Sequence, residues 1–419
     1  GFRLFVIVSA FFLCFVPAAS AFEPSAQDLE LLTKIEKDSL QYFVRMSDKN
    51  TGLTKDSSRP GSPTSIAATG FALAAYAIGA SRGWLPEDYV KTRIITTLRF
   101  LKTKAAHQEG FFYHFLDART GNRVWGSEAS SIDTALVLAG ALLAAQYYPG
   151  TEIESLANEL YRRVNWGWMM NGSDFVCMGW TPESGFLPYY WDSYNELMIL
   201  QALAIGSPSY PIPPKAWEAW LRPEGVYNTH RVVYSSTGSL FTYQFAQAYI
   251  DFRTLDDQGN NYFENSKEAT LANREYSLSF SEKYKGYSDA SWGLSASVGP
   301  GGYRAYGGKP GGGIHDGTIA PYAALSSIVF TPEESIKAAK FFYENHADNL
   351  YGNFGFKDAF NLDKKWWATE YLGIDQGITV LMLENYLNGE VVWKKFMSLP
   401  SIQKWVELTG LKKNKNVTN

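Results

Sequence analysis

Two stretches of this sequence repeat one arrangement of tryptophan and carboxylate side chains, Trp-x2-Glu-x3-Ile-Asp, directly before an apolar segment. The shared residues are Trp125, Glu128 and Asp133 in the first stretch and Trp367, Glu370 and Asp375 in the second. Carboxylates in pairs can carry out general acid–base chemistry, and indole rings can stack on flat apolar faces. The repeat predicts two similar helix starts that face one site.

Further carboxylates stand at other expected helix starts, most clearly Glu196 and Asp316. Glu196 precedes the apolar run 197–200, and burial there would raise its pKa as a general acid requires, although a helix N-terminus acts in the opposite direction. For any single carboxylate, capping of a helix is the more ordinary explanation, worth ~0.3–1 kcal/mol. Several carboxylates around one aromatic mouth instead favour glycoside hydrolysis, which needs a protonated acid and a carboxylate base or nucleophile.

The elements that must position these residues are helices of two kinds in alternation. Segments that are apolar on all sides are expected at 65–80, 130–144, 193–205, 238–252, 318–330 and 374–387. Amphipathic or polar segments are expected at 26–46, 87–104, 151–164, 213–221, 263–282 and 331–346. An apolar helix must be buried and an amphipathic one lies at a surface. The pattern therefore predicts an all-α fold, an (α/α)6 toroid with six inner and six outer helices.

The connections between the helices predict where the site lies. Loops into the inner helices are long, unequal and rich in glycine and aromatic residues, whereas the return loops are short, as at 148–151. Unequal repeats disfavour a solenoid. We expect all long loops on one face, at the N-terminal ends of the inner helices, and expect the site there. Short hairpins are expected at 110–115 and 355–360.

Composition and the chain start narrow the class of protein. The chain is 46% hydrophobic and 16% aromatic with a net charge of −4, so we expect no nucleic-acid partner. Residues 1–21 resemble a signal peptide, which predicts export to the periplasm or medium, no membrane insertion after its removal, and one catalytic domain over residues 22–419. One cysteine, Cys177, remains after that cleavage, and no Cys/His zinc pattern is visible. We expect a monomer without metal or cofactor.

Several segments resemble glycoside hydrolase family 144, whose members often carry the label glucoamylase. They are residues 131–140, 194–200, 238–245, 262–266, 292–297 and 316–321, in the family's order and spread over most of the chain after residue 21. The resemblance implies an (α/α)6 barrel and metal-free, inverting hydrolysis of β-1,2-glucan, by endo action or with release of short oligosaccharides. It places the general acid at Glu196 and an essential acidic residue at Asp133. The base stays open among Asp375, Glu128 and Glu370, because only the local pattern points to them.

The residues expected to contact substrate share polar or aromatic side chains in or beside these motifs. They are Trp125, Glu128, Trp180, Tyr194, Tyr243, Gln244, Trp292, Tyr303, His315, Asp316, Trp367 and Glu370. Among the five histidines, only His230 and His315 are expected on the loop face.

Two other functions remain open. A polysaccharide lyase on the same barrel could use Tyr243, or Tyr303 with Arg304, to abstract a proton, but the acidic loop face disfavours this chemistry. A non-catalytic glucan-binding protein is disfavoured because Glu196 and Asp133 are both present.

Overall fold

A computed structural model describes residues 22–413 and contains a ring of six inner helices. These helices are α2 (Ile66–Ser81), α4 (Ser131–Tyr147), α7 (Met198–Ile205), α9 (Phe241–Tyr249), α11 (Pro321–Leu325) and α13 (Gly373–Leu387). Almost every side chain on them is buried, as their uniformly apolar sequences predict.

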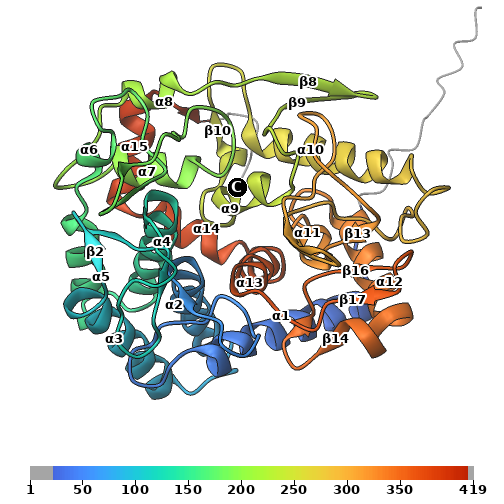
Figure 1. The fold of residues 1–419 in the computed structure, drawn as a ribbon, viewed down its shortest axis with the longest axis horizontal. Helices are drawn as coiled ribbons and strands as arrows, with labels where there is room; N and C mark the ends of the chain where they lie inside the picture. Colours follow the sequence, from blue (N-terminus) through green and yellow to red (C-terminus); the bar gives the residue numbers. More distant parts are fainter. Residues whose placement is uncertain (1–21, 414–419) are drawn as a thin grey trace, which may run out of the picture.

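The other helices lie outside this ring, and most of them surround it (Figure 1). They are α1 (Ala26–Met46), α3 (Glu87–Thr103), α5 (Glu152–Arg163), α6 (Trp166–Met169), α8 (Lys215–Ala219), α10 (Tyr262–Leu278), α12 (Pro332–Leu350), α14 (Val391–Met397) and α15 (Pro400–Thr409). Helix α1 packs on both α2 and α13, so the first and last parts of the chain close the ring together. The predicted (α/α)6 toroid is confirmed.

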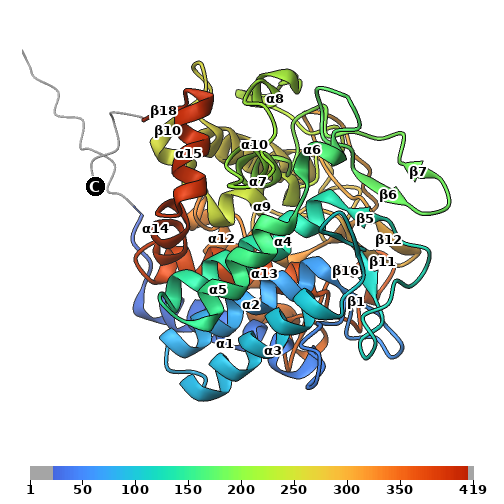
Figure 2. The same cartoon turned by 90° about the vertical axis from the view of Figure 1, so that its left-hand side faces the viewer.

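Short antiparallel strands gather at one end of the toroid, while α14 and α15 lie at the opposite end (Figure 2). The sheets at the strand-bearing end pair β1 (Thr64–Ser65) with β4 (Phe115–Leu116), β5 (Ala129–Ser130) with β6 (Gly179–Thr181) and β7 (Gly185–Phe186), β11 (Ser297–Gly299) with β12 (Gly302–Arg304), and β13 (Thr318–Ile319) with β16 (Phe360–Asn361) and β17 (Trp366–Trp367). Other pairs are β2 (His107–Gln108) with β3 (Phe111–Phe112), β8 (Glu224–Tyr227) with β9 (His230–Val233), β14 (Tyr351–Gly352) with β15 (Gly355–Phe356), and β10 (Leu255–Asp256) with β18 (Lys412–Lys413). The long loops therefore share one face, as predicted.

Serine side chains fix the starts of several helices. Ser25 forms a capping box with Asp28 at α1, and Ser65 and Ser130 accept hydrogen bonds from the first turns of α2 and α4. Each cap satisfies a backbone N–H that has no partner within its helix. These helix starts match the predicted boundaries to within one residue.

Three inner helices are shorter than predicted. Helix α9 lacks three expected residues at each end, since it spans Phe241–Tyr249 and not residues 238–252. Helix α7 begins at Met198 rather than near Ser193, because the side chain of Asn195 accepts a hydrogen bond from the N–H of Leu197 and holds a turn there. Helix α11 has five residues, because residues 318–319 pair with β16 as a strand. Glu196 consequently lies in a turn before α7 and not in the helix itself.

Glycines let α2 and α4 approach closely. A Cβ atom at Gly140 would lie 1.9 Å from the carbonyl oxygen of Gly70, far inside van der Waals contact. The two backbones can touch only because neither position carries a side chain.

None of the helices within residues 22–413 is long and apolar enough to cross a membrane. The predicted signal peptide, residues 1–21, lies outside the described part of the chain.

Candidate active site

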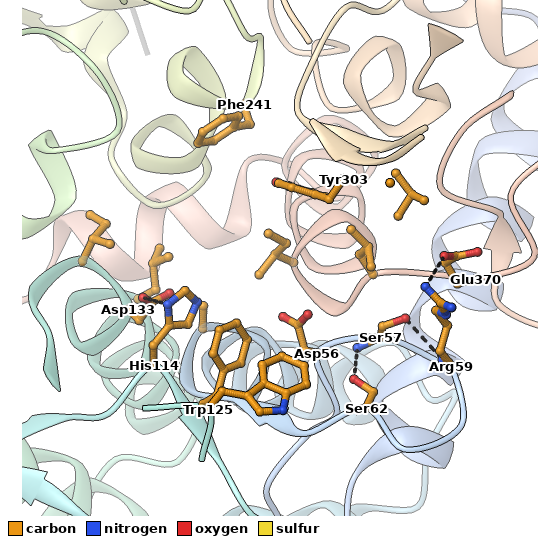
Figure 3. Close-up of a pocket in the computed structure, with 18 of the residues that line it drawn as sticks. Asp56, Ser57, Arg59, Ser62, His114, Trp125, Asp133, Phe241, Tyr303 and Glu370 are labelled. Atoms are coloured by element: carbon orange, nitrogen blue, oxygen red, sulfur yellow. Dashed lines mark hydrogen bonds and ion pairs between the residues drawn. The ribbon is translucent and has the colours of Figure 1, made fainter. Parts of the chain in front are cut away.

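A cavity of about 690 Å³ opens on the strand-bearing face, at the N-terminal ends of the inner helices (Figure 3). Its polar lining comes from several loops and comprises Asp56, Ser57, Arg59, Ser62, His114, Asp133, Glu196 and Glu370. Its aromatic lining includes Phe115, Trp125, Phe241, Phe245 and Tyr303. Five residues predicted from distant parts of the sequence thus meet in one cavity: Trp125, Asp133, Glu196, Tyr303 and Glu370.

Glu196 carries a strongly perturbed carboxyl group. Burial raises its pKa to about 7, and the negative charge of Asp133 acts in the same direction. A group with this pKa keeps a proton near neutrality and can still release it, which suits a general acid. The turn that ends at Leu197 directs the side chain of Glu196 into the cavity.

An imidazole lies between two further carboxylates, those of Glu128 and Asp133. The Nδ1 atom of His114 is 3.1 Å from an oxygen of Glu128 and 3.6 Å from an oxygen of Asp133. Burial alone would lower the pKa of His114, but Asp133 and Glu128 outweigh it and raise the pKa to about 9. His114 is therefore a cation at neutral pH, and its hydrogen bond and charge outweigh the burial of Glu128 and lower the pKa of that carboxyl.

Asp133 is held in place from its own helix. The hydroxyl of Ser130 donates to a carboxylate oxygen of Asp133 at 2.6 Å and accepts from its backbone N–H at 3.2 Å. The helix cap thus also orients the carboxylate that lines the cavity.

The three side chains of His114, Glu128 and Asp133 each place a ligand atom within 4.8 Å of the others. Such a spacing could accommodate a cation. Metal ligation would require the imidazole of His114 to lose its proton. Without a cation, the imidazolium of His114 contacts both carboxylates, and the three side chains form an ion-paired triad.

Asp56 and His114 were not anticipated from the sequence, which favoured His230 and His315 instead. Burial raises the pKa of Asp56, and the cation of His114 partly offsets this effect. Asp56 stands in the polar loop before β1, where the sequence signals only a connection. Asp56 comes close to the imidazole of His114 only when the chain folds. No sequence spacing links positions 56 and 114.

Asp375, the predicted counterpart of Asp133, is almost completely buried and is absent from the cavity lining. It shares a hydrogen bond with Asp358, which also accepts from the N–H of Val298 at 2.7 Å. Burial and the charge of Asp358 hold the pKa of Asp375 well above its usual range, and burial raises that of Asp358 to about 6. A role for Asp375 as the base stays a prediction.

The second repeat contributes to the cavity through Glu370. Its carboxylate is 3.7 Å from the guanidinium of Arg59 and accepts hydrogen bonds from Thr369. Trp367 instead stacks on Phe360 with ring centroids 5.2 Å apart, outside the cavity lining.

Several residues predicted to contact substrate lie elsewhere in the structure. Tyr194, Tyr243, Gln244 and Trp292 are at most 2% exposed and belong to the core. Direct substrate contact by these four side chains is therefore corrected to a packing role. Aromatic rings and amides are common in sugar-binding sites, but they also pack well in a large protein core. In the core, the side-chain amide of Gln244 donates a hydrogen bond to the backbone carbonyl of Ala323.

Three further predicted residues lie away from the cavity lining. Trp180 packs on Trp168, with ring centroids 5.8 Å apart. His315 is enclosed by tyrosine and phenylalanine rings, and Asp316 pairs with Lys364 at 2.8 Å. These residues stabilise loops of the same face rather than line the cavity.

Residues 188–400 match the family model described as "Putative glucoamylase". The chain belongs to this family. The resemblance to glycoside hydrolase family 144 is confirmed, since relatives in that family have related sequences and structures.

One relative is an exo β-1,2-glucooligosaccharide sophorohydrolase (non-reducing end) from Parabacteroides distasonis, 30% identical over 91% of this chain. The chain spans 58% of the length of that relative. An endo-β-1,2-glucanase from Chitinophaga pinensis, solved with sophorotriose and glucose, is 28% identical with a TM-score of 0.83, over 91% of this chain and 98% of the other. A β-1,2-glucanase from Parabacteroides distasonis is 27% identical with a TM-score of 0.86, over 93% of this chain and 61% of the other.

Proposed function

We propose that this protein is a glycoside hydrolase that cleaves β-1,2-glucosidic bonds. The observation that supports the proposal most is the pairing of two carboxyl groups in one cavity: Glu196, whose pKa is raised to about 7, and Asp133, which is paired with a cationic imidazole. Hydrolysis of a glycosidic bond requires one protonated and one ionised carboxyl group. The substrates named for the relatives supply the linkage.

In the proposed reaction, Glu196 donates its proton to the glycosidic oxygen as the bond from that oxygen to the anomeric carbon breaks. A water molecule attacks the anomeric carbon from the opposite face, and Asp133 accepts the proton that this water loses. The reaction begins with protonated Glu196 and ionised Asp133, and it ends with ionised Glu196 and protonated Asp133. Proton exchange with solvent then restores both groups.

The finer features of the reaction rest on the family resemblance. We propose inversion of the anomeric configuration and endo action on a linear chain. The relatives include both an endo-acting and an exo-acting enzyme, so the mode of action needs its own measurement. Export from the cell is proposed on the basis of residues 1–21.

The test is product analysis on linear and cyclic β-1,2-glucans, with the anomeric configuration of the first products followed by NMR. We expect new reducing ends of inverted configuration, and cleavage of the cyclic substrate if the action is endo. Glu196→Gln should abolish the reaction while the protein stays folded. If the wild-type protein releases no reducing sugar, the hydrolase assignment fails. An unsaturated product that absorbs in the ultraviolet would instead indicate a lyase.

A further inference from the structure

Trp125 is unusual in both its exposure and its backbone conformation. Its side chain lines the mouth of the cavity and is 71% exposed, although tryptophan normally buries most of its surface. Its φ angle is 58°, in the left-handed region. Among the non-glycine residues of the described chain with positive φ, it is the one aromatic residue. Backbone strain of this kind persists only where surrounding contacts impose it, and it is common at binding sites.

An ion pair between Arg123 and Glu183, called the brace below, holds the backbone around Trp125 in this conformation. The guanidinium of Arg123 binds both carboxylate oxygens of Glu183, at 2.6 and 2.9 Å, from the turn between β6 and β7. The same guanidinium donates to the carbonyls of Ser127 at 2.5 Å and Gly126 at 2.6 Å, so it holds the backbone on the far side of Trp125. The planar guanidinium of Arg123 thus donates to four acceptors, and it holds the loop around Trp125 more firmly than a single hydrogen bond could.

The indole is also aligned with the acidic centre of the cavity. Its ring centroid is 5.1 Å from that of Phe115, which in turn stacks on His114 at 4.0 Å with an interplanar angle of 12°. His114 contacts Asp133. Two rings therefore lie between the indole and this carboxylate, and Trp125 is displaced toward the mouth (Figure 3).

We propose that Trp125 is a rigid platform on which a glucosyl unit remote from the cleaved bond stacks, and that Arg123 and Glu183 are the residues that position it. The inference rests on the hydrolase function proposed above and adds a chain-binding subsite at the rim. An exposed indole offers a flat apolar face to the C–H groups of a sugar ring at little entropic cost, because the brace has already fixed its backbone. A purely structural tryptophan would be buried and would occupy an unstrained turn.

The first experiment compares Trp125→Ala and Trp125→Phe on linear β-1,2-glucooligosaccharides of increasing length. In Trp125→Ala the gain in kcat/KM with chain length should shrink about tenfold, mainly through KM, whereas Trp125→Phe should keep most of it. Tyr210→Ala removes an exposed aromatic ring from the loop after α7 and serves as the matched control. Binding of the longest oligosaccharide to Glu196→Gln should quench tryptophan fluorescence, and the additional Trp125→Phe change should remove that signal.

The second experiment separates function from folding. Trp125→Gly relieves the left-handed strain, so its melting temperature should be no lower than that of the wild type, while its chain-length preference is lost. Glu183→Gln should raise KM for long chains about threefold in the same direction, since it weakens one half of the brace. Glu152→Gln breaks a similar two-point ion pair with Arg99, at 2.6 and 2.8 Å, on the outer helices and should change neither constant.

The outcomes distinguish the subsite from the reaction itself. If the wild-type protein hydrolyses the oligosaccharides but Trp125→Ala keeps the full chain-length preference, the platform is wrong and the hydrolase assignment stands. A marked loss of thermal stability in Trp125→Gly would also overturn the platform, because it would show that the indole supports the fold. If the wild-type protein hydrolyses none of these sugars, both proposals fall.

Discussion

Glu196 binds its proton more tightly in the folded protein than a free glutamate would, because burial and the charge of Asp133 penalise the carboxylate. The rate of hydrolysis should therefore fall as the pH rises through about 7. Glu196→Gln should lower kcat by roughly 10²–10⁴-fold. A pH–rate profile of the wild type, with a melting curve of the variant, tests this. The assignment would be contradicted if the wild-type rate declined only far above neutrality. It would also be contradicted if Glu196→Gln kept its activity.

The imidazolium of His114 contacts both Glu128 and Asp133, and it lowers the pKa of Glu128. His114→Gln would leave Glu128 and Asp133 close together without a cation, so the acid limb of the pH–rate profile should move up by about one to three units. The matched control is His230→Gln, because His230 also contacts two carboxylates, Glu268 at 2.6 Å and Glu275 at 3.0 Å, outside the cavity. A profile unchanged in His114→Gln would show that the imidazole is only a packing residue.

The sequence allowed Glu196, Asp133, Glu370 and the rim tryptophan to be placed in one site, because each stands beside an apolar segment whose direction is predictable. It did not indicate His114 or Asp56, which meet the others only through the strand pairing of loops. It also did not distinguish core rings such as Tyr243 from cavity rings such as Tyr303. Both kinds of ring occur in similar local sequences, and only packing decides which is exposed.

At the scale of elements, the contact between α2 and α4 gives a clear prediction. Replacing an interior helical glycine by alanine normally stabilises a helix by about 1 kcal/mol. At Gly140 the new Cβ would collide with the backbone of Gly70, and the cost of overpacking, about 1–3 kcal/mol or more, should outweigh that gain. Denaturant unfolding of Gly140→Ala should show a net loss of stability.

Gly167 in α6 provides the control for that experiment. A Cβ there would meet only the side-chain oxygen of Asn165, at 3.9 Å. Gly167→Ala should leave stability unchanged or raise it slightly. Equal losses in the two variants would mean that the close approach of α2 and α4 is not what Gly140 provides.

Most helix boundaries followed from local signals, because a serine cap and the start of an apolar run mark the same residue. The departures occur where a long-range contact replaces the local preference. Residues 318–319 read as helix but pair with β16, and residues 193–197 read as helix but form a turn. Helices α14 and α15 were not anticipated, because their short apolar patterns lie between the last inner helix and the chain end.

At the scale of the whole molecule, several buried and half-buried carboxyl groups share one direction of pKa shift. Burial raises the pKa of Glu36, Asp56, Glu196, Asp358 and Asp375. A carboxyl whose folded pKa exceeds its unfolded value contributes stability that is complete below the unfolded pKa and is lost as the pH rises through the folded one. The folded pKa values, about 6 for Asp358 and about 7 for Glu196, place the loss near neutrality.

We therefore expect the melting temperature to be highest at mildly acidic pH and to fall by a few degrees between about pH 5 and pH 8. Glu36 lies at the interface of α1 and α13, where Glu384 faces it and Arg82 contacts Glu384 at 3.4 Å. Glu36→Gln should flatten part of the decline without changing hydrolysis. A melting temperature that rises steadily up to pH 8 would contradict the conclusion that folding raises the pKa of these carboxyl groups.

The closure of the ring by α1 and α13 has a consequence for how the molecule is made. Because α13 packs on both α1 and α2, part of the apolar surface of each of these helices has no native partner until residue 387 has been synthesised. The cavity likewise draws on Asp56 near the start and Glu370 near the end. A nascent chain must therefore wait for its last inner helix before the complete site exists, so fragments that stop before α13 should be bound by chaperones or aggregate rather than show activity.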